Sequence, residues 1–234
     1  MELEGSERVL DLGCGDGALT AEIARSVPRG SVIGIDASAS MIETAGKTSG
    51  GNVSFEIMDI DAMVFDERFD LIFSNATLHW VKDHRRLLGN CRRALAENGR
   101  LRFNFAGHGN CSAFISVVQD EMGRERFRGY FTGFEWPWFM PRADEYEKLA
   151  GECGPFAVMK VWEENADREF TRDELIGWID QPSIVPFLAP IAPEDRESFR
   201  LAVRERMLET ARTADGRFLE TFRRINVSAR ASPP

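Results

Sequence analysis

A glycine-rich turn directly after a short apolar segment constrains this chain more than any other feature. The apolar segment Arg8 to Leu12 predicts a buried strand, and Gly13, Gly15 and Gly17 follow it at alternate positions. Because glycine has no Cβ, the backbone can turn tightly there and a ligand can approach it closely. Such strand–turn–helix junctions lie at the carboxyl ends of parallel strands, where open α/β sheets bind nucleotides.

Two carboxylates indicate which nucleotide the turn accepts. The spacing Gly13-x-Gly15-x-x-Ala18 also fits the loose dinucleotide pattern. However, Asp11 precedes the turn and Asp16 stands at the start of the expected helix, where an anion would otherwise bind. Negative charge on both sides repels a pyrophosphate but not a cationic, phosphate-free nucleoside. The carboxylates therefore disfavour a nicotinamide-dependent oxidoreductase.

The first half of the chain alternates between short apolar segments and helical patterns. Helical crossovers return the chain in the same direction, so the strands that they join run parallel. The pattern predicts a doubly wound, Rossmann-like α/β core over residues 1–107. Its five expected strands span residues 8–12, 31–35, 52–58, 69–74 and 100–106.

The composition changes after residue 107. Residues 108–150 are dense in aromatic side chains and predict an inserted helical segment after the fifth strand. Residues 151–234 then complete the sheet, with a strand at 156–164, a helical insertion at about 170–212 and a terminal strand over 216–229. The complete expectation is a mostly parallel, seven-stranded α/β sheet with an insertion.

Charge and cysteine usage exclude several classes of partner. The formal net charge of −9 argues against a nucleic-acid partner, because phosphate contacts need clustered Lys and Arg. The four cysteines lack metal-ligand spacing, which predicts no metal site and favours free thiols in the cytoplasm. There is no signal peptide and no apolar run near the roughly 20 residues that span a bilayer, so no membrane partner is expected. The oligomeric state is not indicated.

Acidic residues also end the next two expected strands. Asp36 lies 19 residues beyond Gly17 (36 − 17), at the position where a carboxylate accepts both hydroxyls of an adenosine ribose. Asp59 ends the third strand and can accept a hydrogen bond from the adenine amine, with Ile60 packed on the ring. Asp61 is an alternative acceptor, and a simple polar turn also fits this segment.

Two motifs carry a resemblance to a known family. Asp11 followed by Gly-x-Gly-x-Gly resembles the first motif of class I S-adenosylmethionine (SAM) methyltransferases, in which the turn holds the methionine half of the cofactor. The stretch Ser74 to Asp83, with Leu78-His79-Trp80, resembles the motif after the fourth strand in small-molecule members. Nucleic-acid amino-methyltransferases usually carry an Asn/Asp-Pro-Pro-aromatic motif there, which this chain lacks.

The resemblance implies SAM as the cofactor and S-adenosylhomocysteine as the product. The expected cofactor-binding residues are Asp11, Gly13, Cys14, Gly15, Gly17, Asp36, Ala37, Met41, Asp59, Ile60, Ser74 and Asn75.

His79 and Trp80 are the candidate catalytic residues. A carboxylate acceptor is already an anion and needs no base, whereas an alcohol does. His79 can serve as that base, since its reference pKa lies near neutral pH, or it can orient the cofactor. Trp80 can offer a ring face to the sulfonium or to the substrate, or it can belong to the core.

The second half of the chain resembles a narrower group, the trans-aconitate 2-methyltransferases, in Met140–Tyr146 and Asp215–Leu219. This implies transfer to a small-molecule acceptor, first of all a carboxylate oxygen. It also implies a lid at about 108–150 with an arginine for the substrate, for which Arg126, Arg128 and Arg142 are candidates. The aromatic residues of the lid favour an apolar or unsaturated acid over a highly charged one. N-, C- or hydroxyl O-methylation and a non-catalytic SAM-binding module are the alternatives.

The start of the chain departs from this group, whose members usually carry a helix before the first strand. Here seven residues precede Arg8. We expect that the site is more open, that another segment or subunit covers it, or that the start of the chain is incomplete.

Overall fold

A computed structural model describes residues 3–153 and 156–231, which fall into two compact units. The first unit comprises the chain up to His108, Trp138–Glu164 and the chain from Arg224 onward. The second unit comprises Gly109–Pro137 and Asn165–Arg223. Each unit is described below by itself.

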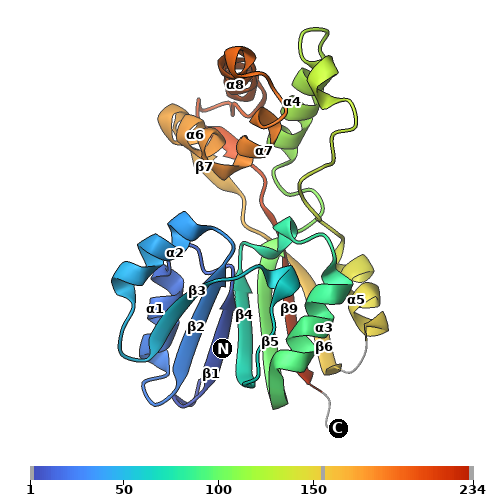
Figure 1. The fold of residues 1–234 in the computed structure, drawn as a ribbon. Coiled ribbons are helices and arrows are strands. Elements are labelled where there is room, and N and C mark those ends of the chain that lie inside the picture. The colour runs from blue at the N-terminus through green and yellow to red at the C-terminus, as the bar shows by residue number, and fades with distance from the viewer. Residues whose placement is uncertain (1–2, 154–155, 232–234) are drawn as a thin grey trace. The chain divides into compact units, whose positions relative to one another are not determined.

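The first unit is built on a seven-stranded sheet in the order β3-β2-β1-β4-β5-β9-β6 (Figure 1). β1 runs parallel to β2 and β4, β2 to β3, and β4 to β5, whereas β9 runs antiparallel to β5. The predicted doubly wound, mostly parallel α/β sheet is confirmed. The strands are β1 (Arg8–Leu12), β2 (Ser31–Asp36), β3 (Val53–Ile57), β4 (Phe69–Asn75), β5 (Leu95–Ala106), β6 (Phe156–Asn165) and β9 (Arg223–Ala231).

Alternating apolar side chains bury both faces of this sheet. Val9 and Leu71 pack in one cluster with Ile23 of α1, while Leu10 packs in a second cluster with Leu87 of α3. Since neighbouring residues of a strand point to opposite faces, the near-continuous apolar strands require a helical layer on each side. The helices of this unit are α1 (Ala18–Ser26), α2 (Ala39–Ala45), α3 (His84–Ala94) and α5 (Ala143–Glu152), with the short turns η1 (Gly46–Thr48), η2 (Ile60–Ala62) and η3 (Leu78–Trp80).

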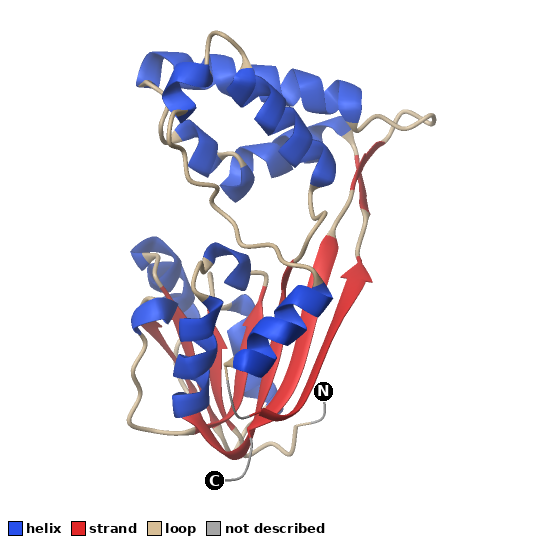
Figure 2. Ribbon diagram, turned by 90° about the vertical axis from the view of Figure 1, so that its right-hand side faces the viewer, coloured by secondary structure: helices blue, strands red, loops and turns tan. Residues whose placement is uncertain are grey.

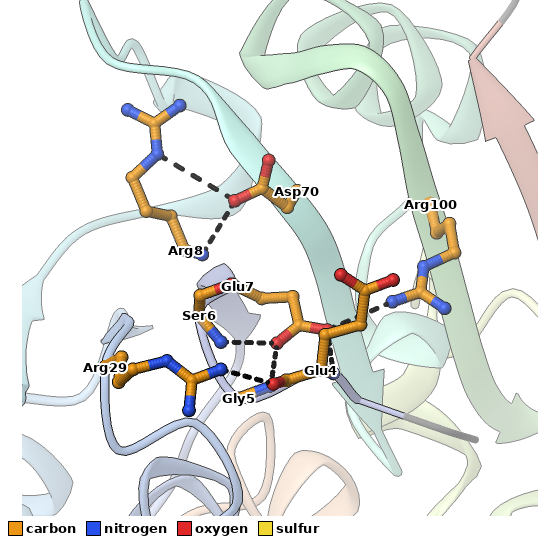
Figure 3. Close-up of polar contacts among 8 residues, drawn as sticks. All are labelled: Glu4, Gly5, Ser6, Glu7, Arg8, Arg29, Asp70 and Arg100. Carbon is orange, nitrogen blue, oxygen red and sulfur yellow. Dashed lines mark hydrogen bonds and ion pairs between the residues drawn. The ribbon is translucent and has the colours of Figure 1, made fainter.

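The carboxylate of Glu7 holds the residues before β1 in place (Figure 3). Its Oε1 accepts the Glu4 N–H at 2.7 Å, and its Oε2 accepts those of Gly5 and Ser6 at 2.9 and 3.1 Å. Arg100 of β5 lies 3.5 Å from the same carboxylate. Burial raises the pKa of Glu7, but the backbone N–H donors outweigh it and hold the pKa below its usual value.

A cavity of about 740 Å³ adjoins these residues, lined among others by Glu7, Asp70 and Arg100. Asp70 accepts the Arg8 N–H at 2.8 Å and lies 3.9 Å from the Arg8 Nε. The carboxylates of Glu7 and Asp70 thus contact backbone N–H groups and arginine side chains. These contacts hold the residues before β1 at this end of the sheet.

The second unit consists of helices and a two-stranded sheet, β7-β8 (Figure 2). Its core is aromatic, with the Phe127 ring 5.1 Å from that of Phe199 and the Trp136 ring 5.3 Å from that of Phe187. In the described ranges of the chain, no helix is long and apolar enough to cross a membrane. Its elements are α4 (Ser112–Gly123), η4 (Arg128–Phe131), β7 (Arg168–Phe170), α6 (Arg172–Trp178), η5 (Ile179–Ser183), α7 (Val185–Leu188), α8 (Pro193–Thr210) and β8 (Phe218–Glu220).

Two boundaries differ from the sequence-based expectations. The segment 216–229, expected as one strand, forms β8 and β9 in different sheets. The chain breaks between them because Glu220 accepts the N–H groups of Ala113 and Phe114 at the start of α4, while Thr221 accepts the Cys111 N–H. The expected insertion 108–150 is divided: residues 109–137 join the second unit, whereas α5 packs on the sheet of the first.

An aromatic cluster around His84, at the start of α3, closes the core of the first unit. His84 is buried, with Nε2 3.0 Å from the Leu78 carbonyl and Nδ1 3.0 Å from the Tyr146 hydroxyl. Its ring lies 4.6 Å from that of Phe139. Burial lowers the pKa of His84 to about 4, against weaker opposing effects of the Leu78 and Val81 backbone.

We expect this histidine to make folding pH-dependent. Its imidazole takes up a proton near pH 6.5 when unfolded but only near pH 4 when folded, so stability present at pH 7 is lost as the pH falls through this window. The shift corresponds to about 3 kcal/mol in the free energy of unfolding. His84→Gln keeps a donor for Leu78 but cannot titrate. Urea unfolding at pH 7 and pH 4 should show a smaller loss for this variant than for the wild type.

Tyr146→Phe provides the matched control. It removes the hydroxyl that hydrogen-bonds His84 but keeps the titrating ring. This variant should be less stable at every pH and should retain the pH-dependent loss. An equal loss in His84→Gln and wild type would contradict the assignment.

Candidate cofactor and acceptor site

The glycine turn is closed by backbone hydrogen bonds to the next strand. The N–H groups of Gly13 and Cys14 both donate to the Ile35 carbonyl, at 2.8 and 3.0 Å. Gly13 and Gly15 have φ angles of 73° and 55°, a region that side chains other than glycine rarely adopt. The turn is therefore a fixed structure at the carboxyl ends of β1 and β2.

The three glycines of the turn face different surroundings. A Cβ on Gly13 would lie 2.1 Å from Cγ2 of Thr77, and one on Gly17 would lie 2.6 Å from the Phe55 ring. A Cβ on Gly15 would meet nothing within 4 Å. Gly13 and Gly17 are thus required by packing, whereas Gly15 borders open space and is the position of the turn that a ligand can approach.

Asp36 connects the turn to the end of β2. Its Oδ2 accepts the Gly15 N–H at 3.0 Å, and its Oδ1 accepts the Ser38 N–H at 2.8 Å. Ala37 and Met41, also expected at the site, follow it and are exposed. Of these three residues, Asp36 contacts the turn directly, at Gly15.

Asp11 lies beneath the turn and is almost fully buried. Its Oδ2 accepts the Thr20 hydroxyl at 2.6 Å. Burial raises the pKa of Asp11 to about 6, with the Thr20 hydrogen bond opposing the shift and the charge of Asp36 adding to it. Two nearby carboxylates in a poorly solvated setting favour a cationic ligand, because such a ligand relieves their mutual repulsion.

Cys14 takes part in closing the turn through its backbone N–H and not through its thiol. Burial, followed by the charges of Asp11 and Asp36, raises the pKa of the Cys14 thiol to about 12. Its Cβ lies 2.9 Å from where a Cβ on Gly34 would be. The thiol is therefore a packing group and not a nucleophile.

Two hydroxyl groups at and after the end of β4 form hydrogen bonds to the last residue of β1 and to the glycine turn. Ser74 Oγ donates to the Leu12 carbonyl at 2.7 Å, and Thr77 Oγ1 donates to the Gly13 carbonyl at 3.0 Å. Asn75 lies between them and is exposed. Ser74 and Asn75 were expected at the site from the sequence, whereas Thr77 was not, because its only signal is its place two residues after β4.

Asp59 and Ile60 follow β3. The Met58 N–H donates to the Asp36 carbonyl at 3.0 Å, which brings Asp59 close to the end of β2. Asp59 is exposed and accepts the Asp61 N–H at 2.9 Å, whereas Ile60 is buried in the core. Of the two alternative acceptors, Asp59 is the one exposed at this edge of the sheet; Asp61 is half-buried.

His79 and Trp80 lie in η3, beyond the end of β4. The His79 carbonyl accepts the Phe139 N–H at 2.8 Å, and the Trp80 ring lies 5.7 Å from that of Trp138. Burial, then the charges of Arg224 and His84, lower the pKa of His79 to about 3, so the imidazole is neutral at pH 7. Within the part of the chain that the structure describes, its buried Nδ1 has no hydrogen-bond partner.

Comparisons with known proteins agree with this geometry. A family model described as a methyltransferase domain matches residues 9–99. The chain is 31% identical over 198 residues to a trans-aconitate 2-methyltransferase of Deinococcus radiodurans, covering 82% of this chain and 75% of the relative. It is 30% identical over 248 residues to a second protein of that name from Methylobacterium radiotolerans, covering 97% and 88%.

The chain belongs to the class I SAM-dependent methyltransferases. Its fold also matches that of the YcgJ protein from Bacillus subtilis, with a TM-score of 0.66 at 17% identity over 100% of this chain and 95% of the other. The expected enzyme class and the expected cofactor, SAM, are confirmed.

The glycine turn and its surroundings can be compared with what SAM needs, a space for its methionine half and no repulsion of its positive charge. The turn leaves space at Gly15, and the carboxylates of Asp11 and Asp36 stand where a pyrophosphate would be repelled. The residues present thus fit a cationic nucleoside.

Alanine substitutions should distinguish the glycines of the methyltransferase turn. Gly13→Ala brings its Cβ within 2.1 Å of Thr77 at a positive φ, so we expect a loss of about 3 kcal/mol or more in the free energy of unfolding. Gly15→Ala meets open space and should cost only about 1 kcal/mol, the penalty of its positive φ. Chemical denaturation of both variants measures the difference. Equal losses would show that Gly13 does not pack as described.

Proposed function

We propose that the methyltransferase holds SAM at the glycine turn with its own carboxylates. Asp36 would accept the ribose hydroxyls, and Asp59 the exocyclic amine of adenine. Gly15 would face the methionine half, with the buried carboxyl of Asp11 beneath the turn. When bound, SAM supplies an electrophilic methyl group on a positively charged sulfur. The half-buried Asp36, the exposed Asp59 and the open space at Gly15 support this assignment.

We further propose that the acceptor atom is a carboxylate oxygen of a small organic acid. The observation that carries this proposal is that the His79 Nδ1 is buried and has no hydrogen-bond partner among the described residues, so no carboxylate bonded to it raises the basicity of the ring. A hydroxyl or protonated amine must lose a proton, and an imidazole with a pKa of about 3 is a poor base at pH 7. A carboxylate is already an anion. The relatives named trans-aconitate 2-methyltransferase support the same acceptor class.

Within this proposal His79 orients the acceptor. Its buried Nδ1, without a partner among the described residues, can be satisfied by a polar group of the ligand. Trp80 and Trp138 form an aromatic wall nearby, since their rings are 5.7 Å apart. The enzyme then acts by positioning the nucleophile and by excluding water.

Asp36→Ala should weaken SAM binding. Loss of a charged contact to the ribose corresponds to about a ten- to hundredfold increase in Kd. Asp16→Ala, which removes an exposed carboxylate of the same turn, is the matched control and should bind SAM nearly as the wild type does. Calorimetric titration with SAM measures both. If the two variants bind equally well, Asp36 does not contact the cofactor.

A substrate screen tests the acceptor class. We expect S-adenosylhomocysteine to accumulate with trans-aconitate or other small carboxylic acids and not with alcohols or amines. His79→Gln should keep transfer to the acid within about tenfold of the wild type, because no base is required. Turnover of alcohols or amines that depends entirely on His79 would refute the proposal and identify the histidine as a base.

A further inference from the structure

The short turn η3, which carries His79 and Trp80, is held by two separate sets of contacts. Just before it, the Thr77 hydroxyl donates to the Gly13 carbonyl at 3.0 Å, which joins η3 to the glycine turn. Within it, the Leu78 carbonyl lies 3.0 Å from Nε2 of His84, the first residue of α3. The second contact belongs to the core of the first unit and not to the glycine turn.

The direction of the hydrogen bond between His84 and η3 follows from the chemistry of its partners. A carbonyl oxygen can only accept, so Nε2 carries the proton and donates it to Leu78. Because burial lowers the pKa of His84 to about 4, the ring is neutral at pH 7 and its Nδ1 is an acceptor. The Tyr146 hydroxyl, 3.0 Å away, donates to that nitrogen. Tyr146 thereby selects the tautomer of His84 that can hold Leu78.

Packing fixes the rings of His84 and Tyr146 as well. α3 and α5 lie side by side on one face of the sheet (Figure 1), and Tyr146 of α5 is fully buried there. The Phe105 ring of β5 lies 5.4 Å from that of His84 and 5.2 Å from that of Tyr146. In a close-packed interior neither ring can turn without displacing a neighbour, so the direction of the His84 Nε2–H group is fixed.

His84 also contacts the second segment of the aromatic wall. The Phe139 ring lies 4.6 Å from the His84 ring, and the Phe139 N–H donates to the His79 carbonyl at 2.8 Å. Phe139 follows Trp138, whose ring lies 5.7 Å from that of Trp80. His84 therefore links the two chain segments that supply the wall.

We propose that His84 is a positioning residue for the methyl acceptor. Through the Leu78 carbonyl it holds η3, and thereby His79 and Trp80, in the place where they meet the acceptor. This inference rests on the proposed function. His84 is 1% exposed, so it acts through η3 and not by contact with a ligand. The glycine turn is closed by bonds that do not involve His84, so its loss should affect the acceptor and not SAM.

Two amides of different length isolate the contact with Leu78. The amide of His84→Gln can reach the place of Nε2 and donate to the Leu78 carbonyl, whereas the shorter amide of His84→Asn reaches only the place of Nδ1. For the acid that the wild type methylates fastest, His84→Asn should lower kcat/KM by about ten- to a hundredfold, the effect of a misplaced acceptor. His84→Gln should recover most of this loss. Calorimetric titration should give both variants nearly the wild-type Kd for S-adenosylhomocysteine.

Leu95→Ala is the matched control for lost stability. Leu95 is buried in the core cluster that also contains Leu87 of α3 and Tyr146 of α5. It pairs with Phe69 at the start of β4, at the opposite end of that strand from η3. The variant should unfold at a lower urea concentration, because it leaves a cavity in the core, and yet keep the wild-type kcat/KM.

Fluorine NMR of protein labelled with fluorotryptophan reports on η3 without a substrate. The Trp80 resonance is assigned by its absence in Trp80→Phe. This resonance should shift in His84→Asn, return toward its wild-type position in His84→Gln and stay in place in Leu95→Ala.

Three results would overturn the inference alone. They are equal kcat/KM in the two His84 variants, an equal loss in Leu95→Ala, and binding of S-adenosylhomocysteine weakened as much as kcat/KM. A wild type that methylates no acid would overturn the proposed function instead, and the Trp80 resonance would then decide whether His84 holds η3.

Discussion

The closure of the glycine turn is the constraint on which the site depends. Gly13 and Cys14 donate to the Ile35 carbonyl of β2, while Thr77 donates to the Gly13 carbonyl. These bonds join three strands at one point of the chain. The methyl of Thr77 then occupies the space that a side chain at Gly13 would need, so the tie is possible only with glycine there. The ends of β1, β2 and β4 are consequently held together by backbone hydrogen bonds and by the Thr77 hydroxyl.

Burial shifts the pKa values of three polar groups near the glycine turn. The carboxyl of Asp11, the thiol of Cys14 and the imidazole of His79 all lie largely out of water, and each has a pKa shifted toward its neutral form. A neutral histidine and an inert thiol provide little acid–base or nucleophilic chemistry. What remains is an arrangement of fixed charges and hydrogen-bonding groups, which suits a reaction between a cation and an anion brought into contact.

The sequence predicted the features that depend on local order. Apolar periodicity placed the strands, and the spacing from the glycine turn to Asp36 identified a carboxylate that the structure bonds to Gly15. Features set by distant contacts were not accessible. The structural roles of Thr77 and Arg224 follow only from their hydrogen bonds to Gly13 and Asn104, which lie far from them in the sequence. The break between β8 and β9 likewise depends on Glu220 bonding α4, 106 and 107 residues away in sequence. Aromatic density suggested a lid, yet several of these rings pack together within the second unit.

The neutral state of His79 also bears on which acceptors the proposed reaction can use. Within that proposal, an amine acceptor is mostly protonated at pH 7, and the neutral His79 could not deprotonate it efficiently. A neutral alcohol would not be activated either, whereas a carboxylic acid is already ionised. Specificity in such a site would arise as much from the lack of a base for the wrong acceptors as from contacts with the right one.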